Sequence, residues 1–508
     1  MIIDGSKQRK LGVVLGYINF LIKMGTQLIY VPIMLKILGQ NEYGVYQLVA
    51  SIISYLSLLN FGFGGSYFRF YAQCKDDKTK EHKLNGTFLM IFTLFAVLVL
   101  IVGIVISINA ELILGNKLTS SEIELSKILL MILAVNMALT FPISVFSSII
   151  SSREAFVFQK LVELLKNMAN PFLTIFILLM GKGSVGLVVV TTFLTVVAGL
   201  VNVWYAIKKL NVRFSFKGLD IRLIREIGIF SFFIFLNSII DQVNWNVDKY
   251  LLGRMVGAAA IAVYSVGAQI NTIYIQVSDM IASVMAPKVN LIVANEQSPM
   301  RELNELFIKV GRFQAYIVVA IVSGFFVLGK DFIVLWAGKD YQEAYVITLL
   351  LIVPAAVPLI QSLGVDIQRA LNKHQIRSLV YAGLSVINIL LSIPLIYKYG
   401  ASGAALGTAF SLVVGNGLIM NIVYFKNIQL NIFDFWKKLF PIIFSSFIPI
   451  CIGFIMNYFW DSLSWITIII KGIVFVVVYF GVEYCIAMND EEKVLLKGRS
   501  FLKKKNKK

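Results

Sequence analysis

The chain has 508 residues, of which 58% are hydrophobic and only 15% are charged, and its formal net charge is +18. A water-soluble protein of this length needs a much more polar surface, because single hydrophobic cores stop growing at a few hundred residues. The composition therefore excludes a soluble globular protein, and lipid must be the solvent for most of the chain.

Long apolar runs, separated by short basic or glycine-containing links, predict an all-α polytopic membrane protein. Many runs exceed the ~20 residues that a helix needs to cross hydrocarbon, and about fourteen transmembrane helices are expected. The alternating strands of about 10 residues that mark an outer-membrane barrel do not occur. In chain order the predicted spans lie near residues 11–38, 43–72, 85–108, 123–150, 156–180, 185–207, 227–252, 258–285, 307–328, 344–366, 376–397, 401–425, 439–459 and 465–487.

Lysine and arginine alternate along the links and so predict the orientation of the chain. They are frequent before the first span, in the second, sixth, eighth and tenth links and in the tail. The opposite links carry few: Lys117, Lys182, Arg254, Lys330, Lys339 and Lys398. By the positive-inside rule, both termini are expected in the cytoplasm and the chain in the cytoplasmic (inner) membrane. This distribution explains most of the net charge without a nucleic-acid partner.

An internal repeat divides the expected helices. Gly39 and the following Gly44-Val45-Tyr46 match Gly257 and the following Ala262-Val263-Tyr264, 218 residues later. Two six-helix lobes are predicted, at 1–210 and 211–425, followed by two appended transmembrane helices at 426–490 and a basic cytoplasmic tail at 491–508. Because each lobe holds an even number of spans, the two lobes are expected to be parallel repeats.

The repeated motifs also carry a resemblance to a known family. The segments Tyr30-Val31-Pro32, Leu38 to Tyr46 and Leu58 to Gly62 resemble the start of the polysaccharide transporters, or repeat-unit flippases, of the multidrug/oligosaccharidyl-lipid/polysaccharide exporter superfamily. Asn246 to Gly253 and Val263-Tyr264-Ser265 resemble the second-half counterpart.

The resemblance implies a function and a shape. Members of this family are V-shaped alternating-access proteins that flip a polyprenyl-pyrophosphate-linked oligosaccharide across the bilayer for O-antigen (lipopolysaccharide), capsule or exopolysaccharide assembly. The implied partners are this cargo, the lipid bilayer, H⁺ or Na⁺ as a coupling ion, and a polysaccharide polymerase. No enzymatic activity is expected, and the sugar composition stays open.

Cations at membrane depth are the first candidates for a binding site. Charged groups inside a membrane are costly and therefore mark functional positions, and a pyrophosphate needs fixed positive charges. Lys23, Arg69 and Lys249 are the candidates for this cationic site. The alternatives are an internal ion pair for Lys23 and an interfacial position for the heads of Arg69 and Lys249.

Acids and amides form a second candidate set. Asn237, Asp241, Asn244 and Asp248 follow helical i, i+4, i+3, i+4 spacing, which predicts one polar face. With Asp279 they are candidates for contact with sugar or for ion coupling. Structural pairing is the alternative for Asp248.

Metal and nucleotide chemistry find no support in the sequence. The cysteines Cys74, Cys451 and Cys485 and the two histidines are too scattered for a disulfide framework or a metal site, and no cofactor is expected. Gly324 and Lys330 match a phosphate-binding loop, but Asp331 replaces its Ser or Thr.

Two other functions compete with the flippase. A drug/cation antiporter of the same superfamily should have an acidic and aromatic cavity in place of a cationic one. A membrane glycosyltransferase or polymerase normally needs a large outer loop, and the outer links here are short.

Overall fold

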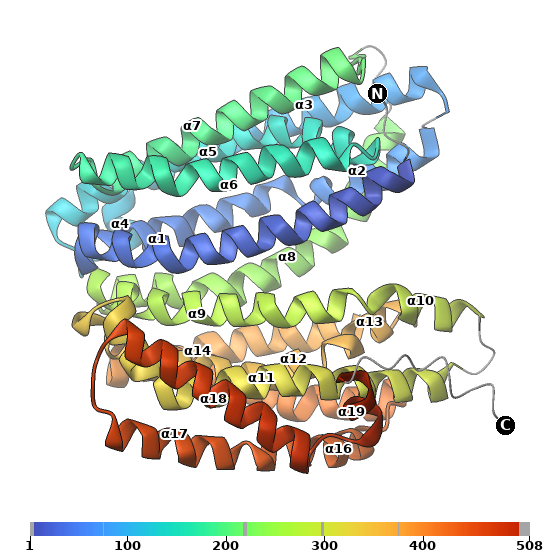
Figure 1. Cartoon of the computed structure of the whole chain (residues 1–508). Coiled ribbons are helices and arrows are strands. Elements are labelled where there is room, and N and C mark those ends of the chain that lie inside the picture. Colours follow the sequence, from blue (N-terminus) through green and yellow to red (C-terminus); the bar gives the residue numbers. More distant parts are fainter. Residues whose placement is uncertain (1–4, 75, 217–220, 296–298, 374, 497–508) are drawn as a thin grey trace. The chain divides into compact units, whose positions relative to one another are not determined.

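The computed structural model describes residues 5–74, 76–216, 221–295, 299–373 and 375–496. Every regular element in these ranges is helical, as Figure 1 shows, which confirms the predicted fold class. The elements are α1 (Gly5–Leu56), η1 (Ser57–Asn60), α2 (Phe63–Cys74), α3 (Lys78–Ile108), α4 (Ala110–Leu114), α5 (Ser120–Ser152), α6 (Phe156–Leu179), α7 (Gly183–Trp204), η2 (Tyr205–Lys209), α8 (Ile221–Met255), α9 (Ala258–Ser283), α10 (Ala286–Asn295), α11 (Met300–Trp336), η3 (Lys339–Tyr341), α12 (Ala344–Ile360), α13 (Ser362–Ala370), α14 (Gln375–Leu412), η4 (Val413–Ile419), α15 (Met420–Val423), η5 (Tyr424–Ile428), α16 (Ile432–Ser445), α17 (Phe447–Phe459), α18 (Trp465–Ile486) and α19 (Asp490–Leu496).

The helices of the described ranges are long and apolar enough for a multi-pass membrane protein. Ten helical segments could each cross a membrane, and an eleventh arises if α12 and α13, which are bent by 42°, form one broken span. Two of the ten, Leu11–Cys74 and Gln375–Ile428, are 64 and 54 residues long. Each of these two therefore holds two of the predicted spans.

Glycine divides both of these long segments. Gly39 in α1 has φ 71° and Gly400 in α14 has φ 58°, inside helices that otherwise continue on both sides. These positive φ values are accessible to glycine but strained for residues with a Cβ. Two predicted outer links are thus single-residue breaks.

The chain divides into two compact units. Unit 1 comprises Met1–Ser265 and Ile396–Ala401, and unit 2 comprises Val266–Leu395 and Ser402–Lys508. The predicted repeat instead has its boundary at residue 210, so α8 belongs to the second repeat by sequence although it packs in unit 1 against α1 and α2. Compactness and repetition are different criteria, and the parallel six-helix repeat and its V shape stay predictions.

In unit 1, α1 packs against α5, α6 and α8, while α5 packs against both α3 and α7.

A close backbone approach fixes the start of the second predicted span. A Cβ on Gly44 would lie 1.9 Å from the carbonyl oxygen of Ala258, at the start of α9. Glycine is required at position 44 because a backbone carbonyl within a helix cannot move away from an added Cβ.

In unit 2, α11 is the central helix and packs against α12, α16, α17 and α18. The rings of Phe307 and Phe435 stack with centroids 4.4 Å apart, and Phe435 also covers Gly311. This stack joins α16 to α11. The two appended spans, which are α16 with α17 and then α18, all pack against α11 (Figure 1).

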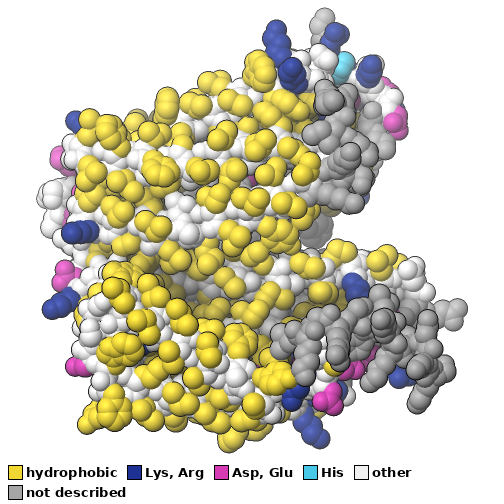
Figure 2. All heavy atoms as spheres, viewed as in Figure 1, with side chains coloured by type: hydrophobic (Ala, Val, Ile, Leu, Met, Phe, Trp, Pro, Cys, Tyr) yellow, Lys and Arg dark blue, Asp and Glu magenta, His cyan; other side chains and the backbone are white. Residues whose placement is uncertain are grey.

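The surface of the described residues agrees with a lipid environment. Figure 2 shows hydrophobic side chains along the flanks of the helices on the visible face, with most charged side chains near the helix ends. Large apolar side chains such as Ile108 and Leu179 are 71% and 72% exposed. In a bilayer, lipid tails would cover these side chains, so no apolar surface would be exposed to water.

Candidate functional site

Lys249 is held by the first helix of the chain. Lys249 is a half-buried residue of α8. Its ammonium donates a hydrogen bond of 3.0 Å to Oε1 of Gln47 on α1. The amide nitrogen of Gln47 in turn donates to the hydroxyl of Tyr43 at 2.9 Å. Among the described side chains, the groups that orient this lysine are therefore neutral and do not cancel its positive charge.

Asp248 faces a different partner from its neighbour Lys249. Its side chain is buried, with 2% exposure, and Oδ2 accepts a hydrogen bond of 2.6 Å from the hydroxyl of Tyr264 on α9. Tyr264 belongs to the repeated Val-Tyr motif. This contact fits the structural alternative for Asp248, whereas its role in ion coupling stays a prediction.

The other two predicted cations are exposed. Lys23 lies on α1, and Arg69 lies on α2 with its guanidinium 4.4 Å from the ring centroid of Phe230 on α8. Such a cation–π contact orients the guanidinium without neutralising it. All three predicted cations thus lie in unit 1, and two of them, Arg69 and Lys249, join α8 to another helix.

The predicted polar face of α8 can be followed only in part. The side chains of Asn237 and Asp241 lie outside the described residues. Asn244 is half-buried and Asp248 is buried, so the face as a whole stays a prediction. Asp279 is exposed on α9 in unit 2, near enough to Asp366 of α13 for their charges to interact.

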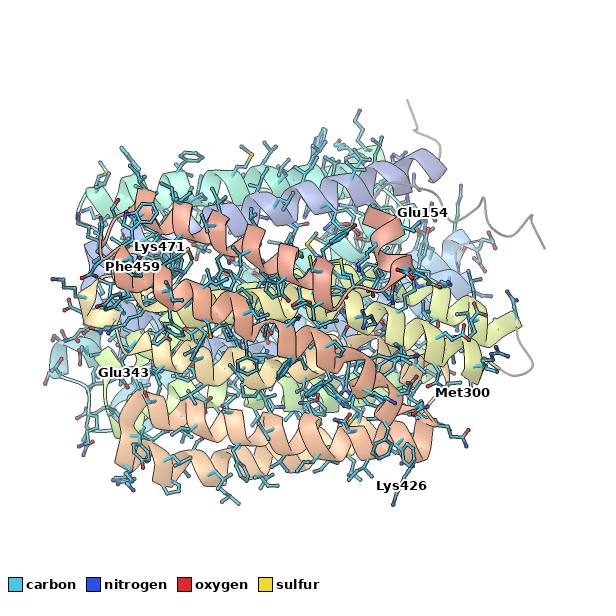
Figure 3. All side chains as sticks on the ribbon, turned by 60° about the horizontal axis from the view of Figure 1, so that its bottom comes forward. Glu154, Met300, Glu343, Lys426, Phe459 and Lys471 are labelled. Atoms are coloured by element: carbon cyan, nitrogen blue, oxygen red, sulfur yellow. The ribbon has the colours of Figure 1, made fainter. Side chains whose placement is uncertain are left out.

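Two intramembrane lysines were missed by the sequence analysis. Lys166 on α6 donates to the hydroxyl of Thr195 on α7 at 3.0 Å. Lys471 on α18, labelled in Figure 3, is only 2% exposed. It donates to Oδ1 of Asn457 on α17 at 3.0 Å. Lys471 stands inside an apolar run, and this position alone could have marked it as a candidate, whereas Lys166 follows Lys160 and Glu163 near the start of α6.

A buried ion pair closes one end of unit 2. Arg312 of α11 and Glu492 of α19 are 8% and 6% exposed, and two guanidinium nitrogens each donate to a carboxylate oxygen at 2.7 Å. The hydroxyl of Tyr316 also donates to Glu492 at 2.9 Å. The pair forms part of the wall of a cavity of about 800 Å³, together with Lys288, Lys309, Asp434 and Lys438.

The surroundings of Glu492 determine its charge. Burial alone would raise the pKa of this carboxyl, but hydrogen bonds from Arg312 and from the backbone of Asn489, with the charge of Arg312, outweigh burial and hold the pKa below its usual value. Glu492 is therefore ionised at neutral pH. The structure thus places a firmly bound helix, α19, at the start of the predicted basic tail, whose residues 497–508 lie outside the described ranges.

Comparison with known proteins fixes the family. A profile of the family described as "Polysaccharide biosynthesis protein" matches residues 13–290, which is more than half of the chain. The chain belongs to this family. The predicted family resemblance, made from the motifs in the first two spans and their repeat, is confirmed.

The chain is also similar to the "Putative O-antigen transporter" of Shigella flexneri. It is 22% identical over 403 residues, which cover 76% of this chain and 90% of the relative. The likeness extends over most of both chains.

Solved transporter structures share the fold. The lipid II flippase MurJ, in an inward closed conformation, superposes with a TM-score of 0.73 at 18% identity and covers 93% of this chain and 99% of its own. An inward-facing multidrug resistance transporter of the MATE family, within the MOP superfamily, gives 0.64 at 14% identity, with coverage of 81% and 96%. At these identities the likeness concerns the fold alone.

Proposed function

We propose that this member of the polysaccharide biosynthesis family is a flippase, which moves polyprenyl-pyrophosphate-linked oligosaccharide repeat units from the cytoplasmic to the outer leaflet. The observation that carries the proposal is the charge of unit 1 at membrane depth. Lys23, Arg69 and Lys249 contact neutral or aromatic groups in the described residues, or are exposed. A pyrophosphate would supply the opposite charge that these cations require.

The printed functions of the relatives support the same assignment. The chain is similar in sequence to a putative transporter of O-antigen and similar in fold to a flippase of lipid II. A transport function, and not enzymatic catalysis, also agrees with the transporters to which this chain is similar in sequence and in fold. The pathway, whether O-antigen, capsule or exopolysaccharide, is set by the cargo that the cell supplies.

Loss of the protein should trap the cargo inside. In cells that lack it, lipid-linked oligosaccharide is expected to accumulate and to stay inaccessible to periodate added outside spheroplasts, whereas cells complemented with the wild-type chain should expose it. The assay is the amount of oxidised glycan in lipid extracts. Equal oxidation with and without the protein would contradict the flippase assignment.

The drug/cation antiporter is the second candidate, favoured by the MATE-like fold and by the buried carboxylate of Asp248. It predicts a different outcome in the same cells. Loss of an antiporter would raise sensitivity to cationic drugs and leave the leaflet distribution of lipid-linked saccharide unchanged.

The proposed orientation places both termini in the cytoplasm. In unit 2, Met300 and Lys426 lie at one end of the helices and Glu343 and Phe459 at the other, as Figure 3 shows. The first end adjoins Lys288, Arg301, Lys309 and Lys438, so the positive-inside rule favours the cytoplasm for that end.

Reporter fusions test this orientation. Green fluorescent protein fused after Lys426 should fluoresce, and alkaline phosphatase fused after Glu343 should be active, because each reporter works on one side of the membrane only. A phosphatase that is active after Lys426 and inactive after Glu343 would reverse the proposed orientation.

A further inference from the structure

Helix α6 has a polar stripe through the membrane. Gln159, Glu163, Lys166, Asn167, Asn170 and Thr174 recur at helical spacing, whereas Leu161, Leu165, Met168, Phe172 and Phe176 form the exposed apolar side. A helix with one polar and one apolar side places the polar side against protein or water. This stripe faces α1 and α7, with which α6 packs.

Two contacts fix the register of α6 against α1. The backbone nitrogen of Val157 donates to Oε1 of Gln8 at 3.3 Å, and the amide nitrogen of Asn167 donates to Oδ1 of Asn19 at 2.9 Å. The sequence separations are almost equal, so the two helices run parallel. With a rise of 1.5 Å per residue, Lys23 and Lys166 lie about 8 Å apart along the helix axes, on either side of the asparagine pair.

The charges at this point are not balanced within unit 1. No described carboxylate forms an ion pair with Lys23 or Lys166. Glu163, one turn before Lys166, is near enough for its charge to act on Lys166, but it is also bonded to Lys160 at 2.8 Å, so this one carboxylate faces two lysines of α6. The pair of helices therefore carries an excess of positive charge at membrane depth, which is costly unless an anion compensates it.

A buried hydrogen-bond donor near the two lysines also lacks an acceptor among the described residues. Asn19 is only 4% exposed, and its Nδ2 has no hydrogen-bond acceptor among the described residues. Leaving such a group unpaired costs free energy. The two ammonium groups and this amide nitrogen are donors only, and Oδ1 of Asn19 already accepts from Asn167. Donors without a free acceptor suit a phosphate better than a sugar hydroxyl, since a hydroxyl also donates.

We propose that Asn19, Lys23 and Lys166 form an anion site between α1 and α6 that binds a phosphate of the cargo's diphosphate group. The assignment rests on the proposed flippase function and adds Lys166 and Asn19 to the cation Lys23. Lys166 is positioned for this role by Thr195, which accepts one of its hydrogen bonds and leaves its charge intact.

Binding of farnesyl diphosphate to the purified full chain tests the site without any translocation. Lys166→Gln should weaken binding about tenfold or more, because a charge-assisted hydrogen bond is lost. Lys160→Gln is the matched control on the same helix, since Lys160 is exposed and paired with Glu163, and it should stay within about twofold of the wild type. Farnesol, which has no phosphate, should bind all variants alike.

Lys23→Gln provides a second variant, at an exposed position where folding is tolerant of the change. It should also weaken farnesyl diphosphate binding, and Lys166→Arg should restore most of the affinity. Equal affinities of Lys166→Gln and Lys160→Gln, or a wild type that binds farnesol as tightly as farnesyl diphosphate, would overturn the site. Translocation of the whole cargo is measured separately, so failure of the site and failure of the flippase function are distinguishable.

Discussion

Replacing Lys23 with alanine should abolish export of lipid-linked saccharide while the protein stays in the membrane. Lys23 is exposed on α1 and forms no ion pair with a described residue, so its removal deletes a charge that the fold does not need. A lost contact to a charged group costs roughly 1.5–3 kcal/mol, or about a tenfold to hundredfold loss of affinity. Surface glycan, measured by quantitative immunoblot alongside the amount of membrane-inserted protein, is the measurement.

Two variants sharpen this test. Lys23→Arg should retain partial export because charge matters more here than the shape of the donor, whereas Lys160→Ala should export normally. The same loss is expected for Lys249→Ala, although the bond to Gln47 gives that lysine a structural role as well. Normal export by both alanine variants would remove the main support for a cationic site.

The Arg312→Ala variant should be strongly destabilised. Removing Arg312 leaves the carboxylate of Glu492 buried without its cation, and breaking a buried pair on one side costs about 3–5 kcal/mol. Arg301→Ala is the control, since the pair of Arg301 with Glu305 is 92% and 70% exposed and such pairs contribute about 0–1 kcal/mol. Thermal unfolding of the detergent-solubilised protein should show a much lower transition for Arg312→Ala only.

The same pair predicts a dependence on pH. The folded-state pKa of Glu492 lies below its usual value, so the stabilisation is fully present above the unfolded pKa of about 4.3 and is lost as pH falls through the folded value. The gap in transition temperature between wild type and Arg312→Ala should therefore shrink as the pH falls below about 4. A gap that stays constant or widens with acid would contradict the ion pair.

Much of the fold could be predicted because lipid imposes a simple rule on sequence. A run of about 20 apolar residues has to form a helix in hydrocarbon, and glycines such as Gly39 and Gly400 mark the breaks between such runs. The family could also be predicted, since the motifs around Gly39 and Tyr264 are short and continuous in the sequence.

Contacts between distant segments could not be predicted in the same way. Arg312 and Glu492 are 180 positions apart in the sequence. Both lie in stretches rich in basic residues, and the positive-inside rule accounts for these without an ion pair. The packing of α8 in unit 1 depends on side-chain fit between helices and not on hydropathy. Structural pairing is an alternative that the sequence offers for Asp248, but that its partner is the hydroxyl of Tyr264 depends on the rotation of α8 and α9 about their axes.

The polar stripe of α6 shows a different limit. Its spacing was visible in the sequence, but Lys160, Glu163 and Lys166 stand close to the start of the helix, where charged residues commonly lie at the membrane interface. Only the bond from Lys166 to Thr195, with the bond from its neighbour Asn167 to Asn19, places Lys166 inside the packed bundle.

The most direct measurement of the central claim is translocation by the purified protein in liposomes. Fluorescent polyprenyl-pyrophosphate-linked oligosaccharide would be incorporated in both leaflets, and dithionite added outside would bleach the outward-facing label. With the wild-type chain, bleaching should proceed to completion, and with Lys23→Ala it should stop once the outer leaflet is bleached, as in protein-free liposomes. Bleaching by the wild-type chain that stops at the protein-free level, in liposomes shown to contain folded protein under an imposed H⁺ or Na⁺ gradient, would contradict the flippase assignment.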